Sequence, residues 1–204
     1  MTALRLCFIG PANNVTFRRW VEWFTSRGHQ TTVLTVEPTQ ETHHFRQIDL
    51  SCHYGGRKIG RIVSAARLAY VVRCLRPDVV HVHYLRGLAW GVPLVRFCPV
   101  VVTPWGSDVL GEQGAFKEWY SWVLTRNVLA SADLIAVHSK YLEGRIRPLL
   151  KNGARVVRVG WGVNLQAFKP GLDIESLCQR WNIGPDQQII FSPRLAQPCY
   201  RHDL

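Results

Sequence analysis

The stretch RVGWGVNLQAFKP, residues 158–170, divides this chain of 204 residues into two parts. Before it, apolar strand-like runs alternate with helical segments, and after it the same alternation starts again. Two glycines flank Trp161 and the apolar Phe168 follows, which is typical of a stiff, closely packed crossover rather than a flexible Gly/Ser linker. We therefore predict a first domain over residues 1–163 and a second part over residues 164–204.

The first part has the pattern of an α/β domain, with short apolar strands and helices whose apolar residues recur every three to four positions. Strands are expected at residues 4–9, 31–36, 78–82, 100–103, 134–137 and 156–159. Helices are expected at residues 15–27, 62–75, 87–97, 115–129 and, capped by Ser139, up to about 150, with a long loop over 38–58. This order predicts a Rossmann-like parallel sheet with helices on both faces.

The second part holds too little for a sheet of its own. A helix is expected over residues 174–181 and a strand over residues 188–191. Because a lone strand cannot form a sheet, residues 171–204 are expected either to be disordered or to pack on the first domain.

The composition is that of an ordinary soluble globular protein, with 47% hydrophobic and 19% charged residues. The apolar runs end well before the roughly 18–20 residues that a membrane span needs. Residues 4–10 are too short for a signal peptide and read better as a first strand. The cysteines show no metal-ligand spacing, and reduced core thiols in the cytosol are the favoured interpretation. The expected location is therefore cytoplasmic.

The charge is strongly basic, with 25 Lys and Arg against 14 acids and a net charge of +11. Residues 140–158 contain six basic residues and one acid, Glu143. Such a face beside exposed aromatics suits anionic lipid at the inner face of the membrane, nucleic acid or phosphorylated ligands. The alternative is a solvated basic surface whose acidic counterpart lies in a missing half of the protein. No recognition helix, zinc motif or RNA-binding signature is present, so nucleic acid is not an expected partner.

Ligands of a doubly wound sheet bind at the carboxyl ends of its strands, and the first loop there is Gly10-Pro11-Ala12-Asn13-Asn14. A glycine and small polar residues at this turn allow a ligand to approach the backbone and the N–H groups of the next helix. The loop is not a GxGxxG motif, and a glycine at this turn is common in the fold. By itself it does not define a nucleotide site.

Two histidines, His81 and His83, end the expected strand over residues 78–82. We interpret their alternation as placing them on opposite faces of the strand, so that they do not ligate one metal together. One of them is expected to be buried and hydrogen-bonded. His83, nearer the strand end, is expected to reach the cleft, although a purely structural role is the favoured interpretation.

The segment Thr103-Pro104-Trp105-Gly106-Ser107-Asp108 follows another strand. An exposed Trp105 would offer a platform for a sugar face, and Asp108 would accept hydrogen bonds from hydroxyl groups, with Gly106 permitting a tight turn. The alternative is that Trp105 packs under the loop and Asp108 caps a helix. The residues leave both interpretations open.

Taken in order, these elements resemble glycosyltransferase family 4, retaining enzymes of the GT-B fold. The resemblance implies two Rossmann-like halves around an active-site cleft, with the acceptor held mostly by the N-terminal half and the nucleotide-sugar donor by the C-terminal half. The matching pieces are RPDVVHVH (76–83), VVTPWGSD (101–108), SADLIAVHSKYL (131–142), VGWGVNLQAFKP (159–170) and IIFSPRL (189–195).

The resemblance also implies site residues. Trp105 and Asp108 lie in the block expected to be catalytic, and Arg194 matches the basic residue near the donor phosphates, where it would stabilise the leaving diphosphate without a metal. The residues expected to face the acceptor or the cleft are Gly10, Pro11, Asn13, Asn14, His83, Gly106 and Asn164.

The chain departs from the family pattern at several positions. Trp105 stands where the family often has a histidine, Asn164 stands where it usually has an aspartate, and the lysine expected shortly after Arg194 is missing. No two glutamates lie eight positions apart, so the paired-glutamate donor motif is absent from this sequence.

The expected function is transfer of a sugar from a nucleotide-sugar to a glycan, lipid or small-molecule acceptor, with retention and without a cofactor or metal. The chain is expected to be a truncated N-terminal part with little or no activity alone. The alternative is a non-catalytic module that docks on anionic membrane lipid or a phosphorylated ligand.

Overall fold

The structure is a computed structural model that describes residues 2–52, 56–109, 116–150, 154–184 and 186–190. Contacts divide the chain into two compact units, Met1–Trp161 and Gly162–Leu204. Within the described residues, no helix combines the length and the apolar character that crossing a membrane requires.

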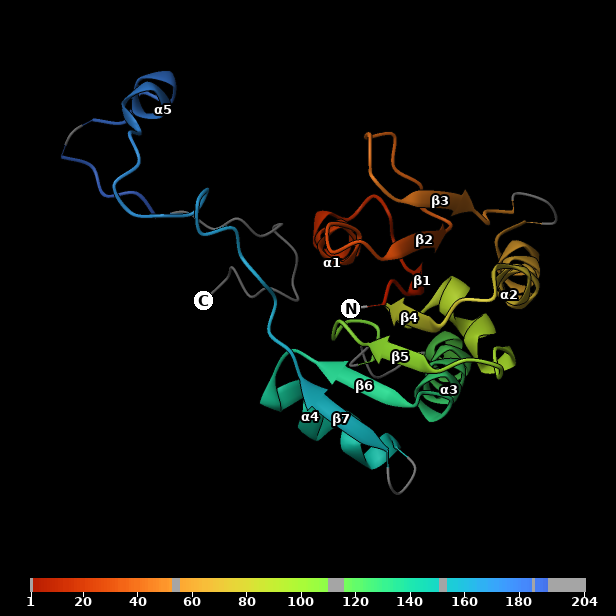
Figure 1. Cartoon of the computed structure of the whole chain (residues 1–204). Coiled ribbons are helices and arrows are strands. Elements are labelled where there is room, and N and C mark those ends of the chain that lie inside the picture. The colour runs from red at the N-terminus through yellow and green to blue at the C-terminus, as the bar shows by residue number, and fades with distance from the viewer. Residues whose placement is uncertain (1, 53–55, 110–115, 151–153, 185, 191–204) are drawn as a thin grey trace. The chain divides into compact units, whose positions relative to one another are not determined.

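The first unit is built on a seven-stranded sheet in which every neighbouring pair is parallel, in the order β3-β2-β1-β4-β5-β6-β7 (Figure 1). The predicted Rossmann-like fold is thereby confirmed. The strands are β1 (Arg5–Ile9), β2 (Gln30–Thr35), β3 (Arg46–Asp49), β4 (Val79–His83), β5 (Val100–Thr103), β6 (Leu134–Val137) and β7 (Arg155–Arg158).

Helices cover both faces of this sheet. In Figure 1, α1 lies on one side of the sheet, and α2 and α3 lie on the other. The helical elements are α1 (Val15–Thr25), α2 (Gly56–Leu75), the 3-10 helix η1 (Gly87–Leu94), α3 (Phe116–Ala130), α4 (Lys140–Ile146) and the 3-10 turn η2 (Arg147–Leu149).

Helix α4 shows how local sequence sets the ends of an element. The predicted cap is confirmed, because the backbone N–H of Leu142 donates to Oγ of Ser139 over 3.1 Å. The helix ends at Ile146 rather than near 150. Pro148 has no N–H to continue the helical hydrogen bonding, and the chain tightens into η2.

Two predicted elements differ from the structure. The expected loop over residues 38–58 contains β3, which pairs with β2 from Thr32–Arg46 to Thr35–Asp49, and α2 begins at Gly56. As an exposed edge strand, RQID shows no apolar alternation, and its pairing creates the strand. The helix expected over 87–97 is the 3-10 helix η1, which contains Pro93.

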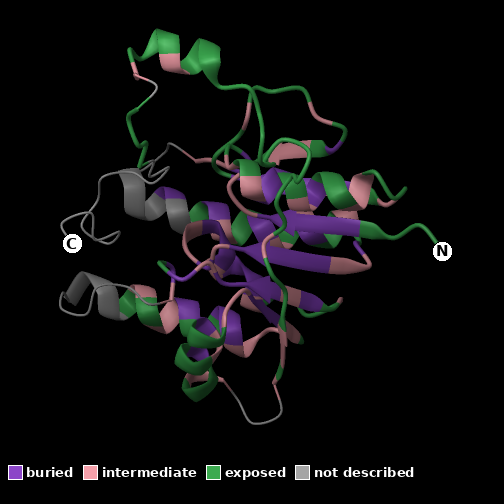
Figure 2. Cartoon of the chain, turned by 90° about the vertical axis from the view of Figure 1, so that its left-hand side faces the viewer, coloured by how far each residue is buried: buried purple, intermediate pink, exposed green. Residues whose placement is uncertain are grey.

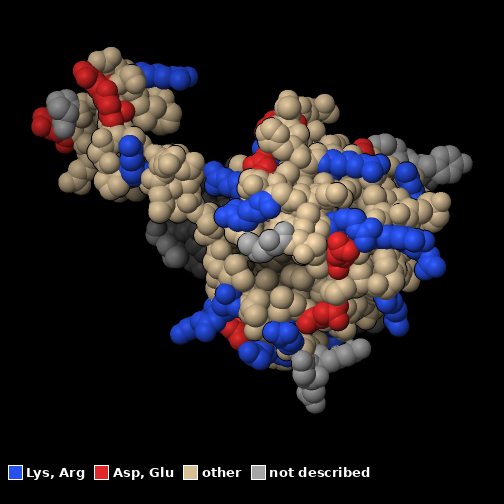
Figure 3. Space-filling model, in the orientation of Figure 1, with Lys and Arg blue, Asp and Glu red and all other residues tan. Residues whose placement is uncertain are grey.

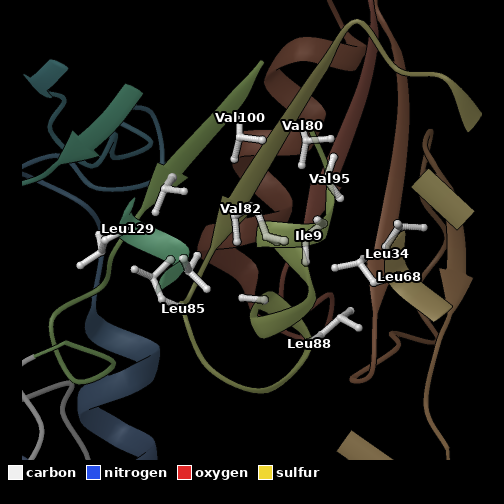
Figure 4. Close-up of a cluster of buried hydrophobic side chains, with 14 of the residues drawn as sticks. Ile9, Leu34, Leu68, Val80, Val82, Leu85, Leu88, Val95, Val100 and Leu129 are labelled. Atoms are coloured by element: carbon white, nitrogen blue, oxygen red, sulfur yellow. The ribbon is translucent and has the colours of Figure 1, made fainter. Parts of the chain in front are cut away.

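The core alternates across the sheet. Cys7 and Ile9 of β1 face the larger of two apolar clusters, while Leu6 and Phe8 face the smaller one beneath α1. Figure 4 shows side chains of the larger cluster converging from the strands, α2 and η1, and Figure 2 shows the central strands as the buried part of the unit. This burial on both faces explains why the strands read as continuous apolar runs.

The second unit contains one described helix, α5 (Glu175–Arg180), within the range predicted for it. The predicted strand over 188–191 is not observed in its described part, because residues 188–190 have no regular secondary structure. Phe191 lies outside the described residues.

Replacing Gly91 with alanine is expected to destabilise the first unit by about 2 kcal/mol, as overpacking does. A Cβ atom at Gly91 would lie 2.3 Å from the carbonyl oxygen of Ala65 in α2, so two backbones would have to separate. The matched control is Gly144→Ala in α4, where a Cβ meets nothing within 4 Å. It should stabilise by about 0.5–1 kcal/mol. Urea denaturation of both variants measures the difference, and equal stabilities would contradict the prediction.

Candidate ligand-binding site

The main cavity of interest lies at the carboxyl ends of the strands, where the sheet order reverses. β1 and β4 are neighbours, but the chain leaves β1 toward β2 on one side and β4 toward β5 on the other. Ligands of open α/β sheets bind at such a switch point. A cavity of about 1090 Å³ opens there. Its lining includes Gly10, Pro11, Glu37, Cys52, Tyr84 and Arg86.

The first loop contributes two residues to this cavity and a helix cap to the fold. Gly10 and Pro11 line the cavity. A Cβ atom at Gly10 would lie 2.6 Å from the ring of Phe17, so the glycine also lets α1 pack on β1. Asn14 caps α1, since its Oδ1 accepts from the N–H groups of Thr16 and Phe17 over 2.9 and 3.3 Å.

Asn13 is tied into the neighbouring loop rather than into the cavity. Its backbone N–H donates to the carbonyl oxygen of Glu37 over 3.1 Å. Neither Asn13 nor Asn14 lines the cavity. Their roles toward an acceptor stay predictions.

The prediction that His81 and His83 lie on opposite faces of their strand is wrong. Residues two apart in a strand share a face, and the two ring centroids are 4.3 Å apart. His81 is buried and shares a hydrogen bond of 2.8 Å with Oγ1 of Thr103, as expected for one of the pair. His83 borders the cavity, but its ring is fully buried among aromatic side chains, including Phe17 and Trp20.

Both histidine rings are neutral in the folded state. Burial lowers the pKa of His81 from its ordinary 6.5 to about 3. Burial, and then the neighbouring His81, lower the pKa of His83 well below its ordinary value. In His83, Nδ1 accepts a 3.4 Å hydrogen bond from the indole N–H of Trp105. The remaining proton is therefore on Nε2, which has no partner among the described residues.

Asp108 holds the loop that follows β5. It is buried, and its carboxylate accepts from the backbone N–H groups of Leu85, Trp105 and Gly106 over 2.8–2.9 Å. Burial raises the pKa of the Asp108 carboxyl, and these N–H donors act in the opposite direction. Gly106 has a φ of +110°, a conformation that favours glycine. This geometry makes Asp108 a positioning group for the loop.

Trp105 is half-buried at the same strand edge and does not line the cavity. Its ring forms T-shaped pairs with the rings of Tyr84 and Trp161, whose centroids are 5.9 and 5.7 Å away. Trp161 also contacts Trp20 and His138. The tryptophan of the crossover segment thus belongs to the first unit. A catalytic role for Trp105 stays a prediction.

Two further predicted site residues, Asn164 and Arg194, belong to the second unit. Asn164 is in the second unit, where its Oδ1 accepts from the N–H groups of Gln166 and Ala167 over 3.0 and 3.2 Å. Arg194 lies outside the described residues. Their predicted roles toward the acceptor and the donor phosphates are therefore untested.

Sequence reasoning missed Glu37, Tyr84 and Arg86, which line the cavity at the ends of β2 and β4. The available signal was their position within four residues of the ends of predicted strands. Tyr84 has a φ of +63°, a left-handed conformation that is rare for a residue other than glycine and clusters at functional sites. The conformational propensity of tyrosine does not predict such a conformation.

The described residues contain no group of three or more His, Cys, Asp or Glu side chains placed to hold a metal ion. Five of the cysteines are described, and all five are free thiols. The polar groups at the cavity are instead suited to hydrogen bonding and charge pairing with an organic ligand.

Fold and cavity together define a Rossmann-like domain with a cavity at the switch point of its sheet. The sequence matches the model of the family described as glycosyl transferase 4-like over residues 5–139. That match covers most of the first unit, and the chain belongs to this family. No curated protein sequence matches the chain.

Solved structures of GT-B glycosyltransferases share the fold. Sucrose-phosphate synthase from Thermosynechococcus elongatus is 16% identical with a TM-score of 0.70, over 90% of this chain and 53% of its own. WaaG, a glycosyltransferase involved in lipopolysaccharide biosynthesis, is 14% identical with a TM-score of 0.66, over 89% and 52%.

HepE from Anabaena, solved in complex with UDP-glucose, is 12% identical with a TM-score of 0.60, over 88% and 50%. The chain therefore spans about half the length of the structures it resembles.

Proposed function

We propose that this chain forms the acceptor-side half of a glycosyltransferase that moves a sugar from a nucleotide-sugar to an acceptor with retention. The observation that carries the proposal is the cavity of about 1090 Å³ at the switch point, inside the segment that matches the family model. In this assignment the acceptor occupies the cavity beside Gly10 and Pro11. The acceptor is a glycan, a lipid or a small molecule.

The proposed donor is a nucleotide-sugar. The related structure of HepE holds UDP-glucose, which supports this class of donor. The donor is proposed to bind mainly to a second Rossmann-like half, with Arg194 near its phosphates and no metal or cofactor. The chain spans about half the length of its structural relatives, so we expect it to transfer little or no sugar by itself.

A chimera tests this proposal. The chain up to Asn164 is joined to the donor-side half of a family member, and sugar transfer is measured with a panel of nucleotide sugars and acceptors. We expect transfer by the chimera and none above background by the isolated chain, with the intact family member as the positive control. Sustained turnover by the isolated chain would contradict the proposal that the donor binds mainly to a second half. A folded chimera without transfer would contradict the acceptor-side role.

A second candidate function is docking on an anionic membrane through the basic segment 140–158. Figure 3 shows Lys and Arg side chains gathered over α4 and β7. The single acid there, Glu143, pairs with both Arg147 and Arg158. Lys140 and Arg145 remain exposed, beside Tyr141, whose side chain is 68% exposed. Basic side chains with an exposed aromatic are the elements of interfacial binding.

Co-sedimentation with vesicles separates this function from a solvated basic surface. Binding should require acidic lipid and should weaken as salt rises from about 0.05 to 0.5 M, since screening shortens the reach of these charges. Reversing two exposed charges, in Lys140→Glu with Arg145→Glu, should remove it. Equal binding to neutral vesicles, or no binding at low salt, would reject membrane docking.

A further inference from the structure

Arg86 enters the cavity from a loop that is fixed on several sides. The residue before it, Leu85, donates its N–H to the Asp108 carboxylate over 2.8 Å and accepts from Oγ1 of Thr125 over 3.2 Å. Nε of Arg86 donates to the carbonyl oxygen of Asp108 over 3.4 Å. This hydrogen bond from Nε orients the guanidinium group. The four N–H groups of its two terminal nitrogens make no hydrogen bond within the described part of the chain.

Glu37 lines the same cavity from the end of β2 and is also held by its backbone. Its N–H donates to Oγ1 of Thr35 over 2.9 Å, and its carbonyl oxygen accepts from Asn13 over 3.1 Å. Among the described residues, neither the Glu37 carboxylate nor the Arg86 guanidinium takes part in an ion pair. Among the described side chains that line the cavity there are therefore one cation and one anion, each with hydrogen-bonding capacity left over.

We propose that this cavity binds an acceptor sugar that carries an oxyanion group, a phosphate or a carboxylate, with Arg86 contacting that group and Glu37 accepting from a sugar hydroxyl. The inference rests on the proposed acceptor-side role of the cavity. A guanidinium with free terminal N–H groups pairs with planar or tetrahedral oxyanions through two parallel hydrogen bonds. A carboxylate is an acceptor only, so it suits the hydroxyl face of a sugar and repels the anionic end. Together the two residues orient such a ligand in one direction.

Titration calorimetry on the full chain tests this inference with glucose 6-phosphate, glucuronate and uncharged glucose. We expect at least one of the two anionic sugars to bind ten or more times more tightly than glucose. Arg86→Met should remove that preference. Arg86→Lys should keep part of it, since lysine retains the positive charge but cannot form the two parallel hydrogen bonds of a guanidinium. The control is Arg73→Met, which removes one exposed positive charge from α2 outside the cavity and should leave the preference intact.

A measurement on the unmodified chain covers the case in which the Arg86 variants do not fold. Cys52 lines the cavity, whereas Cys74 is exposed on α2 outside it. Glucose 6-phosphate or glucuronate should slow alkylation of Cys52 by iodoacetamide at least threefold and leave Cys74 unchanged, as read by peptide mass spectrometry. Glucose at the same concentration should protect less.

Three results would overturn the inference: no preference for either anionic sugar, a preference that survives Arg86→Met, or equal protection of Cys52 by glucose. Because these readouts are binding and protection, they are separate from sugar transfer. An inactive chimera with Arg86-dependent anion binding would refute the proposed function alone. An active chimera whose chain shows no such binding would refute this inference alone.

Discussion

Acidification from pH 7.5 to pH 5 is expected to lower the free energy of unfolding of the first unit by about 4 kcal/mol, through its two buried histidines. Burial lowers the pKa of His81 to about 3 and that of His83 well below its ordinary 6.5. The unfolded chain therefore binds protons below about pH 6.5, while the folded chain does not. The contribution of each histidine to the free energy of unfolding is fully present well above pH 6.5. Below that pH it falls by about 1.4 kcal/mol per pH unit for each histidine.

Urea denaturation between pH 7.5 and pH 5 measures this slope. The variant His81→Gln should roughly halve it, since one of the two suppressed titrations is gone. His44→Gln is the matched control, because it makes the same substitution at an exposed histidine. Carboxylates titrate mainly below this window. A free energy of unfolding that does not change between pH 6.5 and 5 would show that the rings are protonated in the folded state.

Asp108→Ala is expected to destabilise the first unit by about 4 kcal/mol, because three backbone N–H groups lose their acceptor in a buried loop. These groups belong to Leu85, Trp105 and Gly106, so the loops after β4 and β5 both lose their anchor. Asp108→Asn should cost less, since an amide oxygen still accepts from part of the set. The orientation of Arg86 should loosen in both variants.

Denaturation of Asp108→Ala is best compared with Asp133→Ala. Asp133 is also a loop aspartate, and its carboxylate accepts from a single backbone N–H, that of Val100, over 2.7 Å. Removing that one acceptor should cost about 1 kcal/mol. Equal losses in the two variants would mean that Asp108 does not hold the loops together, and its assignment as a positioning group would fail.

Local sequence was sufficient for elements whose burial is uniform. The strands around residues 100–103 and 134–137 are buried on both faces, so an apolar run identifies them directly. β3 was missed because an edge strand of polar residues carries no such run. Its existence depends on hydrogen bonds to β2, a partner that lies outside any local window.

The site was harder to predict than the fold. The first loop was located from the general rule about strand ends, and Gly10 and Pro11 do line the cavity. Asp108 was a candidate for contact with sugar hydroxyls, yet its carboxylate is occupied by backbone N–H groups from two loops. Whether a polar side chain already has hydrogen-bond partners within the protein depends on backbone atoms that are distant in the sequence. The sequence does not show which of these atoms come close.

The sequence by itself determined the class of fold and the family, because alternating apolar segments and the order of the motifs can be recognised in the sequence alone. It also placed a division of the chain near the segment RVGWGVNLQAFKP. Only the tertiary structure decided that Trp161 of this segment packs with Trp20 and Trp105 in the first unit. Only the structure brought Glu37 and Arg86 into one cavity. The physical reason is that strand order, not chain order, sets which loops meet at the carboxyl edge of a sheet.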